Sequence, residues 1–552
     1  MFHVTRRAEP YDVCVIGSGA GGGIAAKVLT EAGLHIVLLE AGPDVNPDKD
    51  FKQHIWPWEL PRRGLGYGGD GDDLMAAHGH WSIAGEPYSR FSGTRFAWFR
   101  SRIVGGRMNH FGQGAYRFEP DDFEPTPDGT GWPLNYSELV PFYRKVESHI
   151  GGFGFENSSM PAPPPRCSEL VVRAGCEKLG LSCPVAPASI LTRPKNDRPA
   201  CHYCGQCWRG CRTGAGFNSS LGLIRPALTT GKLTLITNAM VREIIPGING
   251  RIRSVSYIDK VARHERQVRA RAVVVAASPC ETARLLLNSR SSMFPNGLAN
   301  SSGVVGRFLR DSVITQACGY FPRLEAMPPH NHDGSGRPHI WIPNARKADE
   351  TRFHGRFHLL FVGGRYMPLV SEFDEALNGE EGFGPDLKTM LRQRFGAYIN
   401  FIAGGPMLSN ERNRLEVNPS IPDQWGISTP RFEFHWSENE YQMARAMQER
   451  IREVIEASGG EYLGRFPETG DTPHNMSVGG SGFHEQGTVR MGSDPSHSAL
   501  NSFGQAHEVP NLFVVDAAAF PASSDKPPTL TIMALAWRAS EYLVEQAKRG
   551  EL

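Results

Sequence analysis

Four of the ten cysteines in this chain are crowded into one short, glycine-containing segment. They are Cys201, Cys204, Cys207 and Cys211. A structural zinc site normally pairs two close ligands with a second pair farther along the chain. A flexible loop that holds all its thiols together suits an iron–sulfur cluster better, because it must wrap around a compact inorganic core. The spacing favours a cluster; a zinc knuckle that also uses His202, and free thiols, are the alternatives.

A glycine-rich turn near the start of the chain has the spacing needed to receive a dinucleotide. Gly17 permits a tight turn, and Gly19 lets the main chain approach a pyrophosphate. Gly22 lets the following helix pack closely on its strand, so that the helix N-terminus faces the phosphates. Glu40 follows the next apolar run and is placed to accept hydrogen bonds from ribose hydroxyls. The unit predicts dinucleotide binding and does not by itself separate FAD from NAD.

The pattern of apolar residues predicts alternating strands and helices, and these elements would position the residues named above. Short apolar runs typical of buried strands occur at 12–16, 35–39, 273–278 and 511–516, with helical patterns at 24–29, 282–286 and 529–536. Both ends of the chain therefore have an α/β pattern. We expect a discontinuous nucleotide-binding domain, with the middle of the chain forming a separate unit.

Composition excludes several function classes. The 59 Lys and Arg residues nearly balance the 58 Asp and Glu residues, which gives no reason to expect nucleic acid as a partner. No run approaches the roughly 20 apolar residues of a membrane span. The first ten residues lack the pattern of a secretory signal, so we expect a cytoplasmic protein, or a periplasmic one if a partner subunit carries the signal.

Four motifs together resemble the glucose–methanol–choline (GMC) oxidoreductases. They are the glycine turn and the segments 104–110, 484–492 and 528–532, which follow the family's order along nearly the whole chain. The cysteine segment and residues 294–297 are similar to one branch of that family, the bacterial glucoside 3-dehydrogenases and gluconate dehydrogenase flavoproteins. The resemblance implies FAD as the cofactor.

The resemblance also implies a fold and a set of cofactor contacts. The expected fold is a doubly wound, Rossmann-like FAD-binding domain joined to an α+β substrate domain built on an antiparallel sheet. The expected division is 1–312, with the cysteine loop inserted at 195–220, then 313–490 for substrate, and 491–552 returning to the first domain. The expected FAD contacts, besides the glycine turn and Glu40, are Gly105, Gly106, Asn109, Val241, Asp516 and Thr529. His110 is either a covalent flavin attachment point or, as we favour, an ordinary loop histidine.

The family's catalytic base corresponds to His484, whose ordinary pKa suits proton transfer near neutral pH. The family usually has a second His or Asn just before the Pro-Thr-Leu-Thr run, and here that position is Pro527. Proline has no side-chain donor or acceptor, so it cannot hydrogen-bond the substrate oxygen. Asp525, Lys526, an ordered water, or His484 acting with Glu485 alone are the alternatives, and altered or lost turnover is a further one.

These expectations describe an FAD-dependent dehydrogenase that oxidises a hydroxyl of a sugar or glycoside. By the resemblance, Cys201, Cys207 and Cys211 hold a three-iron cluster, and Cys204 is a fourth ligand or a spectator. The cluster implies electron transfer to a cytochrome or quinone, with a small partner subunit. An oxygen-using alcohol or sugar oxidase, and a flavoprotein without turnover, are the competing functions.

Overall fold

The computed structural model describes residues 10–55, 59, 79–325, 327, 334–363, 384–464 and 476–552. Residues 1–9, on which the prediction about a secretory signal mostly depends, lie outside the described part.

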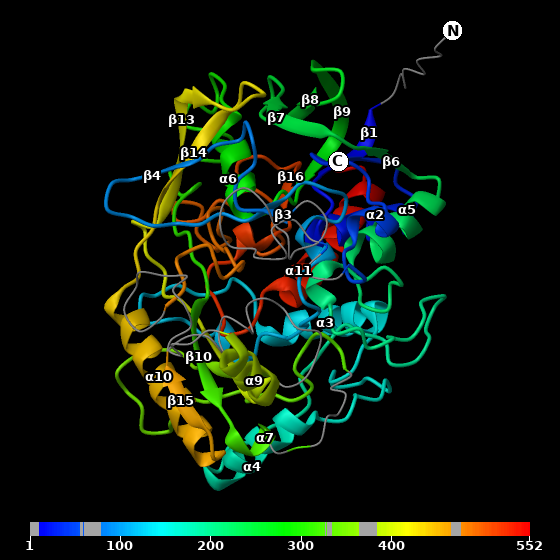
Figure 1. Ribbon diagram of the computed structural model, residues 1–552. Helices are drawn as coiled ribbons and strands as arrows, with labels where there is room; N and C mark the ends of the chain where they lie inside the picture. The colour runs from blue at the N-terminus through cyan, green and yellow to red at the C-terminus, as the bar shows by residue number, and fades with distance from the viewer. Residues whose placement is uncertain are drawn as a thin grey trace.

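A seven-stranded sheet occupies the upper half of the molecule in Figure 1. Its strands are β1 (Tyr11–Ile16), β2 (Ile36–Leu39), β6 (Leu233–Ile236), β7 (Ala239–Pro246), β8 (Ile252–Asp259), β9 (His264–Val275) and β16 (Leu512–Val514). The strands β6, β2, β1, β9 and β16 run parallel, and β8 and β7 continue from β9 as an antiparallel extension. Segments from both ends of the chain therefore meet in one sheet, as predicted.

Helices complete this layer. The helix α1 (Ala20–Glu31) begins directly after the glycine turn, and most of its residues are buried. It packs against α11 (Thr529–Lys548), which in turn packs against α3 (Tyr136–Ile150). The helix α6 (Pro279–Asn288) follows β9 and packs against β7. This sheet and these helices share one large apolar core.

A second, antiparallel sheet lies in the lower half of Figure 1. Its order is β11 (His358–Gly363), β12 (Tyr398–Gly405), β10 (Val313–Tyr320) and β15 (Glu461–Gly464). The helices α10 (Glu438–Ala457) and α4 (Cys167–Lys178) contact it and contribute to a separate apolar core. The fold class predicted from the sequence, a doubly wound α/β unit with an antiparallel substrate sheet, is confirmed. The division of the chain at residues 312 and 490 remains a prediction.

The remaining elements are short. The strands are β3 (Gly79–His80), β4 (Ser89–Arg90), β5 (Arg100–Ser101), β13 (Arg414–Pro422) and β14 (Ser428–Glu433). The helices are α2 (Pro47–Asp50), α5 (Arg225–Thr229), α7 (Pro322–Glu325) and α9 (Gly384–Arg394), with single turns at Gly106–Asn109, Pro120–Phe123, Cys207–Arg209, Ser220–Ile224 and Ala517–Ala519.

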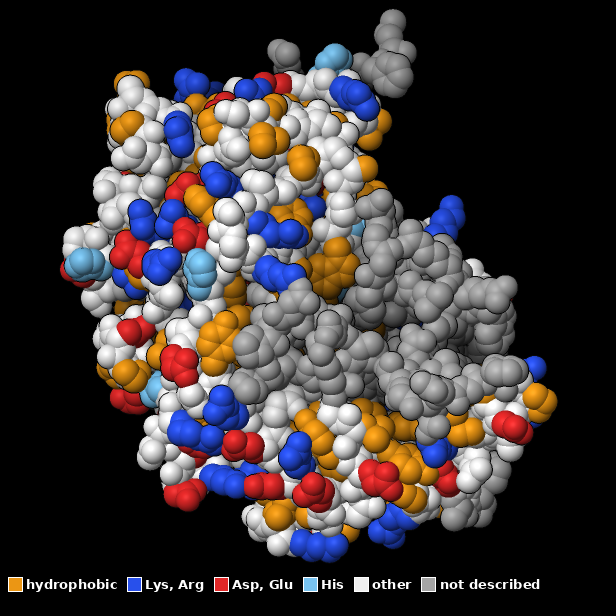
Figure 2. Space-filling view, turned by 60° about the vertical axis from the view of Figure 1, so that its left-hand side comes forward, with side chains coloured by type: hydrophobic (Ala, Val, Ile, Leu, Met, Phe, Trp, Pro, Cys, Tyr) orange, Lys and Arg blue, Asp and Glu red, His pale blue; other side chains and the backbone are white. Residues whose placement is uncertain are grey.

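Within the described ranges, no helix has both the length and the apolar character required to cross a membrane. On the face shown in Figure 2, positive and negative side chains are interspersed, and no field of one sign covers it.

Candidate active site

A cavity of about 410 Å³ connects the two sheets. At one end it is lined by the glycine turn, Glu40 and Val241, and at the other by His484, Gln316 and Leu360. Between these ends the lining residues include Arg107, Asp516 and Thr529. One cavity thus connects the predicted nucleotide site with the predicted catalytic histidine.

The glycine turn brings the main chain close to itself at two positions. Gly17 has a φ of 92°, and a Cβ there would lie 2.4 Å from the carbonyl oxygen of Ala276. A Cβ on Gly22 would lie 1.9 Å from the carbonyl oxygen of Gly17. Gly17 is therefore required for the turn to pass close to the segment after β9, and Gly22 for the close packing of α1 on the end of β1, which is the role predicted for Gly22.

Gly19, unlike Gly17 and Gly22, has open space where a side chain would be. It lines the cavity, precedes the first residue of α1, and would place a Cβ within 4 Å of no protein atom outside its neighbours. The open space beside this glycine lies at a helix N-terminus, where free N–H groups favour an anion. This cradle fits the pyrophosphate of a dinucleotide.

Glu40 closes the same end of the cavity. Its carboxylate accepts hydrogen bonds from the backbone N of Ser18 at 3.2 Å and of Gly42 at 2.9 Å. Burial raises its pKa, and these donors oppose the rise. Glu40 therefore holds the glycine turn as well as facing the predicted ribose position.

Asp516 follows β16 and ties three segments together. Its carboxylate accepts hydrogen bonds from the backbone N of Ser278 at 3.0 Å, from the hydroxyl of Thr282 at 2.6 Å, and from the backbone N of Ala518 at 2.8 Å. Burial raises its pKa to about 6. It fixes the loop after β9 at the wall of the cavity.

The other predicted cofactor residues divide into two groups. Gly106, Val241 and Thr529 line the cavity. Gly105 and Asn109 lie behind its wall: the Gly105 N–H donates to the Ser18 hydroxyl at 2.8 Å, and the Asn109 amide donates to a backbone carbonyl at 2.9 Å. His110 also lines the cavity and packs edge-on against Phe99.

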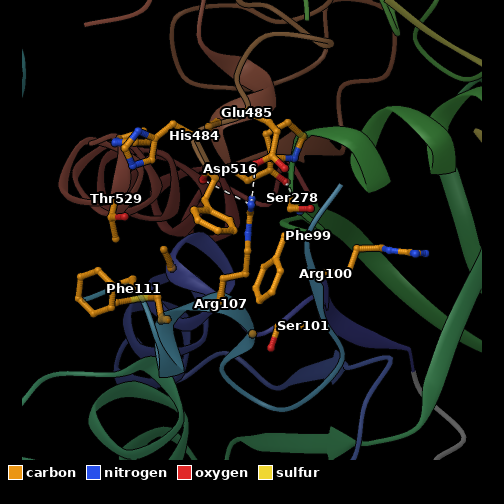
Figure 3. A pocket seen from close by; sticks show the side chains of 18 of the residues that line it. Phe99, Arg100, Ser101, Arg107, Phe111, Ser278, His484, Glu485, Asp516 and Thr529 are labelled. Carbon is orange, nitrogen blue, oxygen red and sulfur yellow. Dashed lines mark hydrogen bonds and ion pairs between the residues drawn. The ribbon is translucent and has the colours of Figure 1, made fainter. Parts of the chain in front are cut away.

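Arg107 and Glu485 form an ion pair at the centre of the site. The guanidinium lies 2.6 Å from one carboxylate oxygen of Glu485, and Figure 3 marks the interaction with a dashed line. The other carboxylate oxygen of Glu485 is buried and has no hydrogen-bond partner among the described residues. Glu485 is thus engaged with Arg107 rather than with His484.

His484 presents its ring to the cavity. Its Nδ1 lies 2.9 Å from the hydroxyl of Ser312. Burial, together with the nearby guanidinium of Arg107 and the side chains of His358 and Arg337, lowers its pKa to about 3. The imidazole is therefore neutral at physiological pH and able to accept a proton.

Asp311, which sequence reasoning did not identify, holds the loop that carries His484. Its buried carboxylate accepts hydrogen bonds from the backbone N of Gly480 at 2.7 Å, of Gly482 at 3.0 Å and of His484 at 3.1 Å. Burial, reinforced by the charge of Glu485, raises its pKa to about 7. No sequence motif marks this aspartate, because its partners lie about 170 positions away.

Pro527 lines the cavity and has no polar side chain. Two residues earlier, Asp525 is buried and lies 3.3 Å from Nδ1 of His358. His358 begins β11 and lines the same cavity as His484. Sequence reasoning missed this second histidine, since nothing near it in the sequence marks it.

The cysteine loop lies against the same cavity. Trp208, next to Cys207, lines the cavity, and Gly336 donates its N–H to the Cys207 thiol at 3.3 Å. The Cys201 and Cys211 thiols accept N–H bonds from Tyr203 at 3.3 Å and Gly216 at 3.2 Å. Within the described residues, no three His, Cys, Asp or Glu side chains are arranged to hold a metal ion.

Family comparisons match most of the chain. The N-terminal model of the GMC oxidoreductases matches residues 20–313, and the C-terminal model matches residues 409–536.

Individual relatives cover nearly the full length. The chain is 29% identical, over 98% of its length and 96% of the relative, to 2-methyl-1,2-propanediol dehydrogenase from Mycolicibacterium austroafricanum. It is 26% identical to the fructose dehydrogenase large subunit of Gluconobacter japonicus, covering 98% of each chain. It is 27% identical to paromamine 6'-oxidase from Streptomyces fradiae, over 96% of this chain and 91% of that one. Among solved structures, pyridoxine 4-oxidase from Mesorbium loti shares the fold with a TM-score of 0.60 at 19% identity, covering 96% of this chain and 99% of that one.

Proposed function

Because this chain belongs to the GMC oxidoreductase family and is therefore an FAD-dependent oxidoreductase of alcohol-type substrates, we propose that it oxidises a hydroxyl group of a sugar or glycoside. The observation that carries the proposal is the continuous cavity between the glycine turn and His484. It offers an anion cradle at one end and a neutral imidazole at the other.

The residues on the cavity wall fit FAD. Gly19 and the N-terminus of α1 would hold the pyrophosphate, Glu40 the ribose, and Val241 the adenine. Gly106 and Thr529 would border the flavin ring. When bound, FAD supplies the acceptor for the hydride that leaves the alcohol carbon.

His484 takes the proton. Since Nδ1 is engaged with Ser312, Nε2 is the atom that would receive the hydroxyl proton of the substrate. The cationic side chains of Arg107 and Arg337 favour the negative charge that develops on the oxygen as its proton leaves. Asp311 positions His484 through the backbone of its loop.

The direct test is a visible spectrum of the purified protein before and after anaerobic addition of a panel of sugars and glycosides. We expect a flavin spectrum that bleaches with at least one member of the panel. A colourless, folded protein that does not take up added FAD would contradict the proposal.

The low pKa of His484 predicts the pH dependence of the reaction. A group whose pKa is about 3 stays in its proton-accepting form as the pH falls from 8 to about 5. We therefore expect the rate of flavin reduction at saturating substrate to show no acidic limb from this histidine across that range. Stopped-flow measurement with the folded state checked at each pH tests it. Because the pKa of Asp311 is about 7, a limb near the ordinary histidine value of about 6.5 would contradict it if it persists in Asp311→Asn.

We further propose that the cysteine loop holds an iron–sulfur cluster. Support comes from four thiols in one loop, of which Cys201, Cys207 and Cys211 each accept a backbone N–H bond, and from the position of Trp208 on the cavity wall. Hydrogen bonds to sulfur are one of the means by which proteins tune such clusters. Cys201, Cys207 and Cys211 would be the ligands of a three-iron cluster, which supplies one-electron transfer, and Cys204 a fourth ligand or a spectator.

Metal analysis separates this proposal from its alternatives. We expect anaerobically purified protein to contain iron and acid-labile sulfide, and Cys207→Ser to lose both while keeping FAD, because the variant lacks one of the three proposed thiolate ligands. Cys318→Ser, on β10 and outside the loop, is the matched control and should keep the iron. Zinc without iron in the wild type would contradict a cluster.

The presence of a cluster also affects which electron acceptor and which partner proteins we expect. With a cluster we expect a dehydrogenase that passes electrons to a cytochrome or quinone and works with a small subunit. The fructose dehydrogenase relative is itself described as a large subunit. Hydrogen peroxide formed in air with substrate would instead favour the oxidase alternative, which the paromamine 6'-oxidase relative keeps open.

A further inference from the structure

Besides His110, which packs against Phe99, the cavity that holds His484 also contains the imidazole of His358, and the proposed mechanism does not use it. It is the first residue of β11, on the antiparallel sheet, whereas His484 lies on a loop held by Asp311. Across the antiparallel sheet His358 pairs with Gly404, and Gly404 pairs with Ile314, two residues after the Ser312 that contacts the His484 ring. Two elements far apart in the sequence thus bring two imidazoles to one place.

Asp525 determines which ring nitrogen of His358 carries the proton and which one can accept a hydrogen bond. Burial alone would raise the pKa of Asp525, but Lys526 and His358 outweigh it and hold the pKa at about 2. The carboxylate is therefore charged and can only accept, so Nδ1 of His358, 3.3 Å away, carries the proton. Burial lowers the pKa of His358, which favours the neutral ring, and its lone pair is then on Nε2.

Nε2 of His358 is available to a ligand. Among the described residues, none forms a hydrogen bond with this atom, and the ring lines the cavity. The ring lies over Gly404 of the neighbouring strand β12, where a Cβ would approach its Cε1 to 2.6 Å. Tyr116 stacks on the ring with centroids 6.4 Å apart. The fold leaves room for this imidazole and holds it in one orientation.

A pair of imidazole acceptors matches a pair of hydroxyl donors. Two nitrogen acceptors cannot both bind one hydroxyl proton, but they can bind the protons of two neighbouring hydroxyls. We propose that His358, oriented by Asp525, accepts a hydrogen bond from a hydroxyl adjacent to the one that is oxidised, so that the site selects vicinal diols. The inference rests on the proposed function and deepens it by naming the substrate class.

The proton balance of the reaction is unchanged by this second contact. The hydroxyl being oxidised would give its proton to Nε2 of His484, and FAD, when bound, would supply the acceptor for the hydride that leaves its carbon. The neighbouring hydroxyl keeps its proton and only donates a hydrogen bond to His358. His358 is thus a substrate-contacting residue, and Asp525 is a positioning residue that acts through it.

A double-mutant cycle between protein and substrate tests the pairing. The probe is a methyl glucoside that reduces the flavin, together with its monodeoxy analogues, each lacking one hydroxyl. In the wild type we expect removal of one hydroxyl adjacent to the oxidised carbon to lower kcat/KM by roughly tenfold, because the Nε2 acceptor loses its partner. In His358→Leu the same removal should cost less than about twofold.

Three more variants keep the test specific. His358→Gln places a carbonyl acceptor near the position of Nε2 and should recover part of the discrimination. Asp525→Asn should weaken it and raise KM for the diol more than it lowers kcat. His149→Leu, a half-buried histidine outside the cavity that contacts the Gly222 carbonyl, is the matched control and should retain the tenfold ratio. FAD content and Tm are measured for each variant.

Every outcome bears on the proposal. Equal losses with the parent glucoside and all deoxy analogues in His358→Leu would show that His358 does not read a neighbouring hydroxyl, and would overturn it. If no glycoside reduces the wild-type flavin, the sugar assignment fails, and the cycle is repeated with cis-cyclohexanediol and cyclohexanol. A tenfold preference for the diol that disappears in His358→Leu would still support the vicinal-diol site, whereas no preference, or no reduction by either alcohol, overturns it.

Discussion

His484→Ala is expected to retain FAD but to lose substrate-dependent flavin reduction by roughly 100- to 10,000-fold, the usual contribution of a positioned general base. The reason is that Nε2 of His484 is the proton acceptor held beside the hydroxyl, with Ser312 and Asp311 fixing the ring and its loop. Neither Glu485, which is paired with Arg107, nor Pro527, which has no polar side chain, can take its place. Stopped-flow reduction under anaerobic conditions measures the change.

The control for this substitution is His149→Ala, which removes a partly buried imidazole outside the cavity and should reduce at close to the wild-type rate. His484→Gln is the informative companion, because its amide fills part of the space but is not a base. If either His484 variant reduced its flavin at a near-normal rate, another group would be the base. His358, with its charged Asp525, would then be the first candidate.

The nucleotide-binding half of the fold could be predicted because its signals are local. Strand, glycine turn, helix, second strand and terminal acid follow one another between Tyr11 and Glu40, so their spacing alone gives the geometry. The predicted strands at 12–16 and 35–39 correspond to β1 and β2 to within one residue. Each of these elements contacts its neighbour in the sequence, and few long-range contacts are needed to place them.

The residues around the proposed catalytic histidine could be predicted only where a sequence motif marks them. His484 and Pro527 were identified from a resemblance, whereas Asp311, His358 and Asp525 act through partners about 170 positions away in the sequence. Such contacts depend on how β10 and β11 are placed against the loops of the other half. No local pattern of charge or spacing reports that placement.

Pro527 gives a second example of what the sequence alone does not predict. The resemblance predicts that the family's usual side chain is missing there, but the sequence cannot show which other residues line the same cavity. In the structure, a histidine from the antiparallel sheet lines the same cavity, and its carboxylate partner is two residues before the proline. The polar side chain missing at Pro527 and the imidazole of His358 on β11 are brought to one cavity only in the folded chain.

Gly19→Ala is expected to leave the protein folded and to weaken FAD binding by at least about 100-fold, equivalent to about 2.8 kcal/mol. The added Cβ would meet no protein atom within 4 Å outside its chain neighbours, and Gly19 has a negative φ of −68°. The methyl group would instead occupy the cavity at the N-terminus of α1, where the pyrophosphate must approach the main chain. FAD content after purification and titration of the apoprotein with FAD measure the loss.

Two other glycines separate a blocked cofactor site from a damaged fold. Gly22→Ala puts a Cβ 1.9 Å from the Gly17 carbonyl oxygen, so it should lower Tm and FAD content together. Gly131→Ala, with no atom nearer than 3.8 Å, should change neither. Of the three, Gly19→Ala alone should give a native Tm in the apoprotein with little bound flavin, because there the glycine makes room for a ligand instead of for the protein itself. Normal FAD binding by that variant would mean that the pyrophosphate does not lie against this turn.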